Sequence, residues 1–132
     1  MLKPSLIVLQ PTPYCNINCS YCYLRNRGDR RRMGADVLAA VRDKIFRWLE
    51  ADACPRVVWH AGEPTTVPIS WYERAYAKLL PWSTAQTVFI MQNERDRSRQ
   101  PLGRFLQANR NPSRPVDRWP AAVSRCAPQD LV

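Results

Sequence analysis

Residues 13–23 read Pro-Tyr-Cys-Asn-Ile-Asn-Cys-Ser-Tyr-Cys-Tyr, and they hold three of the five cysteines in this chain of 132 residues. The three are Cys15, Cys19 and Cys22, so their spacing is C-x3-C-x2-C, and Tyr21 lies directly before the third. Three thiolates on one short loop can ligate three irons of a four-iron cluster, whereas electron-transfer clusters close the fourth position with a fourth cysteine. The spacing therefore indicates a cluster with one open iron, at which a substrate or cofactor can bind.

The compartment follows from how the cysteines are used. Cysteines this close together, in a chain without a secretory signal, favour metal binding over a disulfide framework. The first ten residues contain one short apolar run after Pro4, which is too short for the core of a signal peptide. No stretch is long enough to span a membrane. We therefore expect a cytoplasmic protein without a membrane partner.

Hydrophobic periodicity predicts an α/β fold. Short apolar runs predict three strands, and apolar residues at helical spacing predict two helices between them. Asp36 is the predicted N-cap of the first helix, residues Ser70–Glu73 form a predicted capping box, and Pro81 is predicted to end the second helix. The predicted elements are a strand at 6–9, a helix at 36–51, a strand at 57–59, a helix at 70–80 and a strand at 87–91. Strands and helices in this order predict two right-handed crossovers and a parallel sheet.

This topology brings two motifs together. The cysteine loop follows the first predicted strand, and the run Ala61-Gly-Glu-Pro64 follows the second. In parallel α/β folds, the loops at the carboxyl ends of the strands gather at one edge of the sheet, where ligands bind. The two loops are therefore expected to form a single site.

The cysteine loop, taken with Trp59-His-Ala-Gly-Glu-Pro64, resembles the radical S-adenosylmethionine (SAM) enzymes. The closer resemblance is to the cyclophane-forming peptide maturases, which carry a SPASM auxiliary-cluster domain. It covers about residues 5–92. The resemblance implies the first strands and helices of a partial (β/α)6 barrel, and residues 1–92 are interpreted as the N-terminal part of this core domain.

The same resemblance implies a cofactor site. The three cysteines of residues 13–23 would ligate a [4Fe-4S] cluster, and SAM would bind its open iron. Tyr21 would lie against the adenine, and Gly62 and Glu63 would hold the methionine amine. Ala61 stands where the family's Gly-Gly-Glu-Pro motif has its first glycine, and its methyl group is tolerable if the backbone there does not need a positive φ. No catalytic residue is assigned beyond the cluster ligands.

The reaction that the resemblance implies is reductive cleavage of SAM to methionine and a 5′-deoxyadenosyl radical. That radical would abstract a hydrogen atom from a peptide side chain, and a carbon–carbon crosslink could follow. The cofactor supplies this chemistry, while the protein supplies ligation, orientation and exclusion of water. The implied partners are a ribosomally made precursor peptide and an electron donor of the flavodoxin or ferredoxin type.

Two other classes of protein stay open. The three cysteines with His60 as a fourth ligand would suit a structural zinc site, although zinc sites usually pair cysteines as C-x2-C at two places. The net charge of +9 is compatible with a small nucleic-acid-binding module. We attribute the charge to composition and do not expect a nucleic-acid partner.

Residues 93–132 differ in composition from the rest of the chain. They contain eight arginines, no lysine and five prolines, and no helical or alternating pattern persists in them. A chain that resembles this family would continue here with further strands and helices. We interpret residues 93–132 as a disordered or frameshifted tail after Gln92, which would leave a fragment or an inactive remnant of a longer enzyme. The rival interpretation is a disordered basic tail that binds nucleic acid or an acidic partner.

Overall fold

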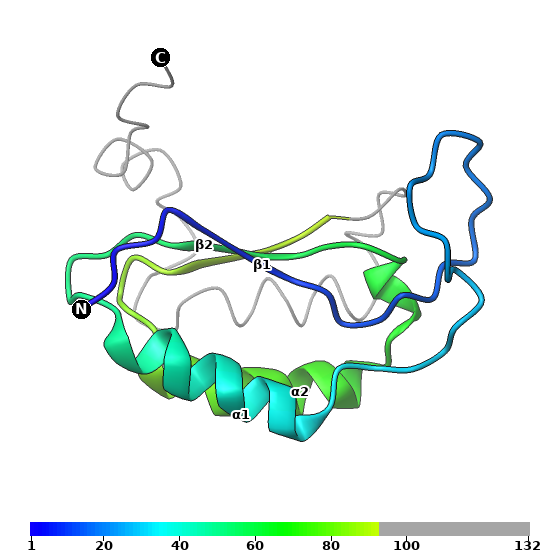
Figure 1. The fold of residues 1–132 in the computed structure, drawn as a ribbon. Coiled ribbons are helices and arrows are strands. Elements are labelled where there is room, and N and C mark those ends of the chain that lie inside the picture. Colours follow the sequence, from blue (N-terminus) through cyan, green and yellow to red (C-terminus); the bar gives the residue numbers. More distant parts are fainter. Residues whose placement is uncertain (93–132) are drawn as a thin grey trace, which may run out of the picture.

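The structure is a computed structural model that describes residues 1–92. The predicted tail at 93–132, with its predicted disorder or frameshift, lies outside the described residues. Within residues 1–92, one three-stranded sheet carries both α-helices on the same face (Figure 1). None of the helices in this part of the chain is long and apolar enough to cross a membrane.

The sheet is parallel, as predicted. Its strands are β1 (Leu6–Leu9), β2 (Arg56–Trp59) and β3 (Val88–Met91), in the order β1-β2-β3. The observed strand bounds differ from the predicted ones by one residue at most. The register pairs Leu9 with Trp59 and Trp59 with Met91, so the three strands end level at their carboxyl ends.

The first helix is shorter than predicted. Helix α1 spans Ala35–Lys44, and the backbone leaves the helical region at Ile45 before the 3₁₀ helix η1 (Phe46–Trp48). The prediction of Asp36 as N-cap was wrong, because Gly34 takes that position without a side-chain capping bond. Asp36 lies in the first turn, where a carboxylate interacts favourably with the helix dipole.

The second helix begins earlier than predicted. Helix α2 spans Ile69–Leu79 and its N-cap is Pro68, so the predicted capping box at Ser70–Glu73 was wrong. The predicted end near Pro81 agrees with the structure, because this proline lies in the 3₁₀ helix η3 (Leu80–Trp82) that follows α2 directly.

One hydrophobic core joins the sheet to the helices. Alternate strand residues are buried in it, and α2 contributes a stripe of buried side chains at helical spacing. Trp59 lies at its centre, fully buried, and packs edge-on against Trp71 and Tyr72 at centroid distances of 5.6 Å. The indole Nε1 of Trp59 donates a hydrogen bond to the Tyr76 hydroxyl at 3.2 Å, so the carboxyl end of β2 is anchored in the core.

The opposite face of the sheet carries apolar residues outside this core. Leu6 and Val8 point there and are 55% and 53% exposed, whereas their neighbours Ile7 and Leu9 are buried. In (β/α) barrels the helices pack outside the sheet and apolar side chains line the inside. The structure therefore agrees with the predicted α/β fold, a partial barrel with three parallel strands and two α-helices within residues 1–92.

Tyr72 links α2 to the loop after β2, and removal of its hydroxyl should destabilise the fold. The hydroxyl donates to the Pro64 carbonyl oxygen at 2.8 Å in a buried environment. We expect Tyr72→Phe to lower the free energy of unfolding by about 1–3 kcal/mol, because a buried carbonyl loses its partner. Urea denaturation followed by circular dichroism measures this change.

The pH dependence of stability gives a second readout on the same variant. Burial raises the pKa of Tyr72 far above its ordinary value, and Tyr76 and Glu63 add to the shift. Above pH ~10 the unfolded chain loses the Tyr72 proton while the folded chain keeps it, so wild-type stability should fall by up to about 1.4 kcal/mol per pH unit. Tyr72→Phe should remove this component, and an identical slope above pH ~10 in both proteins would contradict the assignment.

Candidate functional site

The cysteine-bearing segment belongs to a long loop that is closed at its base. Residues 10–34 connect β1 to α1 and project from the end of the sheet beside the 3₁₀ helix η2 (Pro64–Thr66) (Figure 1). Three hydrogen bonds join the two arms of the loop: Met33 N to Pro11 O at 2.8 Å, Thr12 Oγ1 to Arg31 O at 2.6 Å and Cys15 N to Arg27 O at 3.0 Å. Cys15 therefore lies at the last of these cross-links, and Cys19 and Cys22 lie in the part of the loop beyond it.

All three predicted ligands are free thiols of intermediate exposure. Cys19 and Cys22 sit at the two ends of a tight turn, because the Cys22 amide donates to the Cys19 carbonyl oxygen at 3.2 Å. An Arg27 guanidinium nitrogen also donates to the Cys19 carbonyl, at 3.3 Å. Within residues 1–92, no three histidine, cysteine or acidic side chains are gathered closely enough to hold a metal ion.

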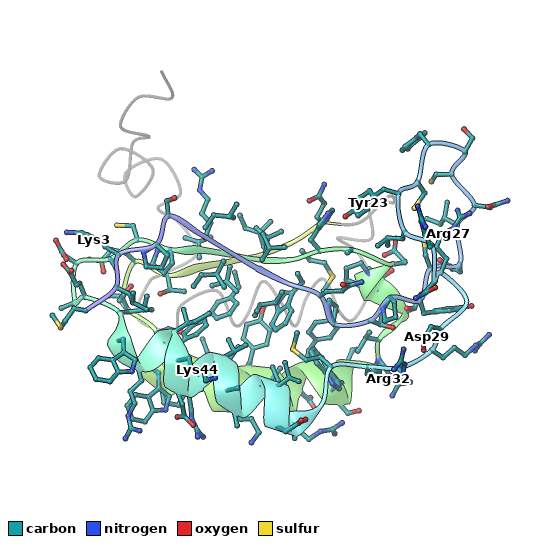
Figure 2. The ribbon with its side chains drawn as sticks, in the orientation of Figure 1. Lys3, Tyr23, Arg27, Asp29, Arg32 and Lys44 are labelled. Atoms are coloured by element: carbon teal, nitrogen blue, oxygen red, sulfur yellow. The ribbon has the colours of Figure 1, made fainter. Side chains whose placement is uncertain are left out.

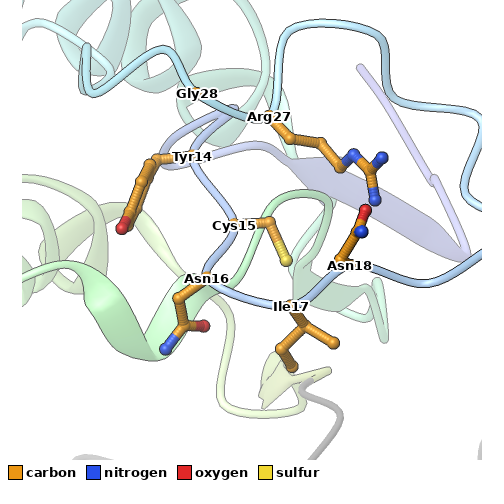
Figure 3. A pocket seen from close by; sticks show the side chains of 7 residues that line it. All are labelled: Tyr14, Cys15, Asn16, Ile17, Asn18, Arg27 and Gly28. Carbon is orange, nitrogen blue, oxygen red and sulfur yellow. The ribbon is translucent and has the colours of Figure 1, made fainter.

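A pocket of about 330 Å³ lies inside this loop (Figure 3). The Cys15 thiol lines it, and the side chains of Arg27 and Asn18 point toward one another beside it (Figure 3). The full lining is Tyr14, Cys15, Asn16, Ile17, Asn18, Arg27 and Gly28. One of the three predicted ligands therefore faces an open pocket formed by its own loop.

The loop after β2 packs directly against the start of the cysteine segment. The Glu63 amide donates to the Tyr14 carbonyl oxygen at 2.8 Å. Gly62 has a φ of +63°, and a Cβ there would lie 2.3 Å from the Thr12 carbonyl oxygen and 2.7 Å from that of Tyr14. Such an approach is possible only for glycine. The expected meeting of the two loops at one edge of the sheet is therefore confirmed.

Ala61 does not meet the condition under which its methyl group was expected to be tolerable. Its φ is +69°, in the left-handed region where a side chain crowds the backbone. The backbone at this position therefore needs the freedom of glycine, and the alanine introduces strain into the loop.

Glu63 is almost fully buried, with 2% of its surface exposed, and its carboxylate caps η2. The side chain accepts hydrogen bonds from the Thr65 amide, at 3.2 Å, and from the Thr65 hydroxyl. These bonds fix the conformation of the turn that begins at Glu63, and the Glu63 amide is the group that donates to the Tyr14 carbonyl. Contact of Gly62 and Glu63 with the methionine amine of SAM stays a prediction.

The two tyrosines that flank Cys22 are exposed, Tyr21 by 79% and Tyr23 by 72%. Contact of Tyr21 with adenine stays a prediction. The Tyr23 hydroxyl lies 3.3 Å from Nε2 of His60, the residue considered as a zinc ligand in the alternative. Sequence patterns did not predict this contact, because it joins residues 37 positions apart.

Relief of the strain at residue 61 should stabilise the protein. We expect Ala61→Gly to raise the free energy of unfolding by about 1 kcal/mol, because glycine adopts a positive φ without a steric penalty. Urea denaturation at equilibrium measures the difference.

A matched control is Ala40→Gly, at an exposed position within α1. It should lower the free energy of unfolding by about 0.5–1 kcal/mol, since glycine weakens a helix interior. If both substitutions destabilise equally, Ala61 is not strained. Gly62→Ala should destabilise more than Ala40→Gly, because its Cβ would overlap two carbonyl oxygens.

No family model matches the chain, and no solved structure matches it. Among curated proteins, it is 37% identical over 75 residues to the uncharacterized protein sll1766 of Synechocystis sp., covering 57% of this chain and 19% of that protein. It is 25% identical over 95 residues to a serine-type anaerobic sulfatase-maturating enzyme of Bacteroides thetaiotaomicron, covering 65% of this chain and 22% of that enzyme. The chain thus spans about one fifth of the length of these relatives. The second similarity supports the radical SAM superfamily, and neither relative supports the cyclophane-forming subtype.

Proposed function

We propose that residues 1–92 form the cluster-binding part of a radical SAM enzyme that modifies a ribosomally made peptide. The observation that carries this proposal is the contact between the two loops. The Glu63 amide donates to the Tyr14 carbonyl, directly before Cys15, so a loop with three free thiols meets the Ala-Gly-Glu-Pro loop at one end of a parallel sheet. The similarity to a sulfatase-maturating enzyme supports the same superfamily.

The donor set suits an iron–sulfur cluster. Thiolates are the ligands that such clusters use, and three of them leave one iron open. Cys15, Cys19 and Cys22 would hold the cluster, which when bound would supply the electron for cleavage of SAM. The Cys19–Cys22 turn and the Arg27 bond to Cys19 hold the backbone of two of these ligands in place.

Three further residues would bind SAM. Gly62 lets the backbone of its loop lie against the cysteine loop without a clash, and Glu63 holds the shape of the following turn. Main-chain groups of these two residues would orient the methionine end. The exposed ring of Tyr21 offers an aromatic face for the adenine.

The substrate and partners are part of the same proposal. The substrate would be a side chain of a precursor peptide, and the product a carbon–carbon crosslink of the cyclophane type. The electron donor would be a flavodoxin or ferredoxin. Residues 25–32 contain five arginines and one aspartate, and that aspartate, Asp29, is paired with Arg31 at 2.6 Å. This basic part of the same loop would suit an acidic donor. A reducing cytoplasm would keep the thiols free.

Reconstitution with iron tests the proposal. We expect the full chain, purified without oxygen and supplied with ferrous iron and sulfide, to bind about four irons and four sulfides. It should show a broad visible absorbance that bleaches on reduction with dithionite. Replacement of Cys15, Cys19 or Cys22 by serine should reduce the iron and sulfide content severalfold, because each removes one ligand.

Ser20→Ala is the matched control, an exposed residue of the same loop between two of the ligands, and it should leave iron and sulfide content unchanged. Zinc bound in place of iron, without sulfide-dependent absorbance, would contradict the proposal and favour the structural zinc site. Cluster binding without release of 5′-deoxyadenosine from SAM would favour the inactive remnant.

A further inference from the structure

The residues on either side of the cysteine segment, residues 15–22, both contact the loop after β2. Tyr14 directly precedes Cys15, and Tyr23 directly follows Cys22. Both tyrosines make a hydrogen-bond contact with the four-residue segment that follows β2, residues 60–63. The cysteine segment is therefore closed at both ends by one short piece of the chain.

The two contacts differ in kind. At the start of the cysteine segment, the contact is between backbone groups, from the Glu63 amide to the Tyr14 carbonyl at 2.8 Å. At its end, the contact is between side chains, with the Tyr23 hydroxyl 3.3 Å from His60 Nε2. Tyr23 lies on the side of the loop that faces the end of the sheet (Figure 2). Only this second contact can be removed by substitution without a change in the backbone.

The piece that closes the segment is itself fixed to the sheet. The His60 amide donates to the Leu9 carbonyl oxygen at 3.0 Å, which extends the ladder between β1 and β2 by one bond. The preceding residue, Trp59, is fully buried in the core. A side chain that bonds to His60 is therefore held relative to the rigid part of the molecule.

Fixed ends lower the entropic cost of bringing three thiols onto one ligand. A segment tethered at one end must be ordered when its side chains converge, and the loss of freedom weakens binding. A segment tethered at both ends has lost part of that freedom already. A contact that fixes one end of the segment can therefore strengthen binding of the ligand without touching it.

We propose that Tyr23 and His60 are positioning residues, which hold the carboxyl end of the cysteine segment against the loop after β2 and so reduce the freedom that the segment must lose when its thiols converge on a ligand that takes all three. This deepens the proposed function, on which it rests for the identity of the natural ligand. The contact between Tyr23 and His60, called the tether below, is formed by the protein alone and needs no cluster. Either group can donate the hydrogen bond, so an amide side chain at position 60 can replace the imidazole.

Arsenite binding tests the effect of the Tyr23–His60 contact on the three thiols without iron–sulfur chemistry. One As(OH)₃ condenses with three thiols to give As(SR)₃ and three waters, and arsenic stays in the +3 state throughout. Binding to the reduced full chain is followed by the ultraviolet absorbance of the arsenic–sulfur bonds. We expect Tyr23→Phe and His60→Leu each to weaken binding by up to about three- to fivefold, because the freed segment loses more freedom on binding and the net strength of one neutral hydrogen bond bounds this effect.

Three further variants make the experiment decisive. The double variant should bind no more weakly than either single variant, because both remove the same contact. His60→Gln should bind within about twofold of wild type, and Ser20→Ala should bind like wild type. Unchanged arsenite binding in Tyr23→Phe, or losses that add in the double variant, would overturn the proposal.

The outcomes separate this inference from the proposed function. If the variants show the expected differences in arsenite binding but the wild-type protein takes up no iron and sulfide, the tether stands and the radical SAM assignment fails. If the protein assembles a cluster while Tyr23→Phe leaves both arsenite affinity and cluster content unchanged, the assignment stands and the tether fails.

Discussion

The close approach of two backbones at Gly62 is the constraint on which the candidate site depends. There the loop after β2 comes within hydrogen-bonding distance of the loop after β1, and the Glu63 amide meets the Tyr14 carbonyl at 2.8 Å. A Cβ at residue 62 would overlap two carbonyl oxygens. The residue before Cys15 therefore keeps its place only while position 62 has no side chain, and the position of the cysteine segment follows from that.

The approach is held in place by the core beneath it. Trp59, at the carboxyl end of β2, is buried against Trp71 and Tyr72 and bonded to Tyr76. A rigid strand end thus leads directly into residues 60–63. The cysteine loop is joined to residues 60–63 by hydrogen bonds, and its thiols are half-exposed. The candidate site therefore combines a rigid strand end with a loop that is held mainly by hydrogen bonds.

The strain in this region is concentrated at Ala61. Its φ of +69° is the single positive φ of a residue other than glycine among residues 1–92. Strained residues persist where the surrounding contacts determine the backbone, and they often lie at binding sites. Here the contacts of Gly62 and Glu63 determine it, so the loop keeps its shape although alanine is a poor residue for position 61.

Much of the fold and part of the site could be predicted from local patterns. The apolar runs predicted three parallel strands, and the C-x3-C-x2-C spacing singled out three thiols that the structure places on one loop. The helix starts were predicted less well, because Asp36 and Ser70 are good capping residues by type while the chain begins its helices after Gly34 and Pro68. Capping preference by residue type therefore did not locate the start of either helix.

By itself, the sequence determined the order of strands and helices and singled out three cysteines as candidate ligands, since periodicity and spacing act over a few positions. Only the tertiary structure decided that position 61 needs a positive φ, that Glu63 caps a turn, and that Tyr23 meets His60 from 37 residues away. These features depend on which surfaces the folded chain brings together, and no local pattern records that.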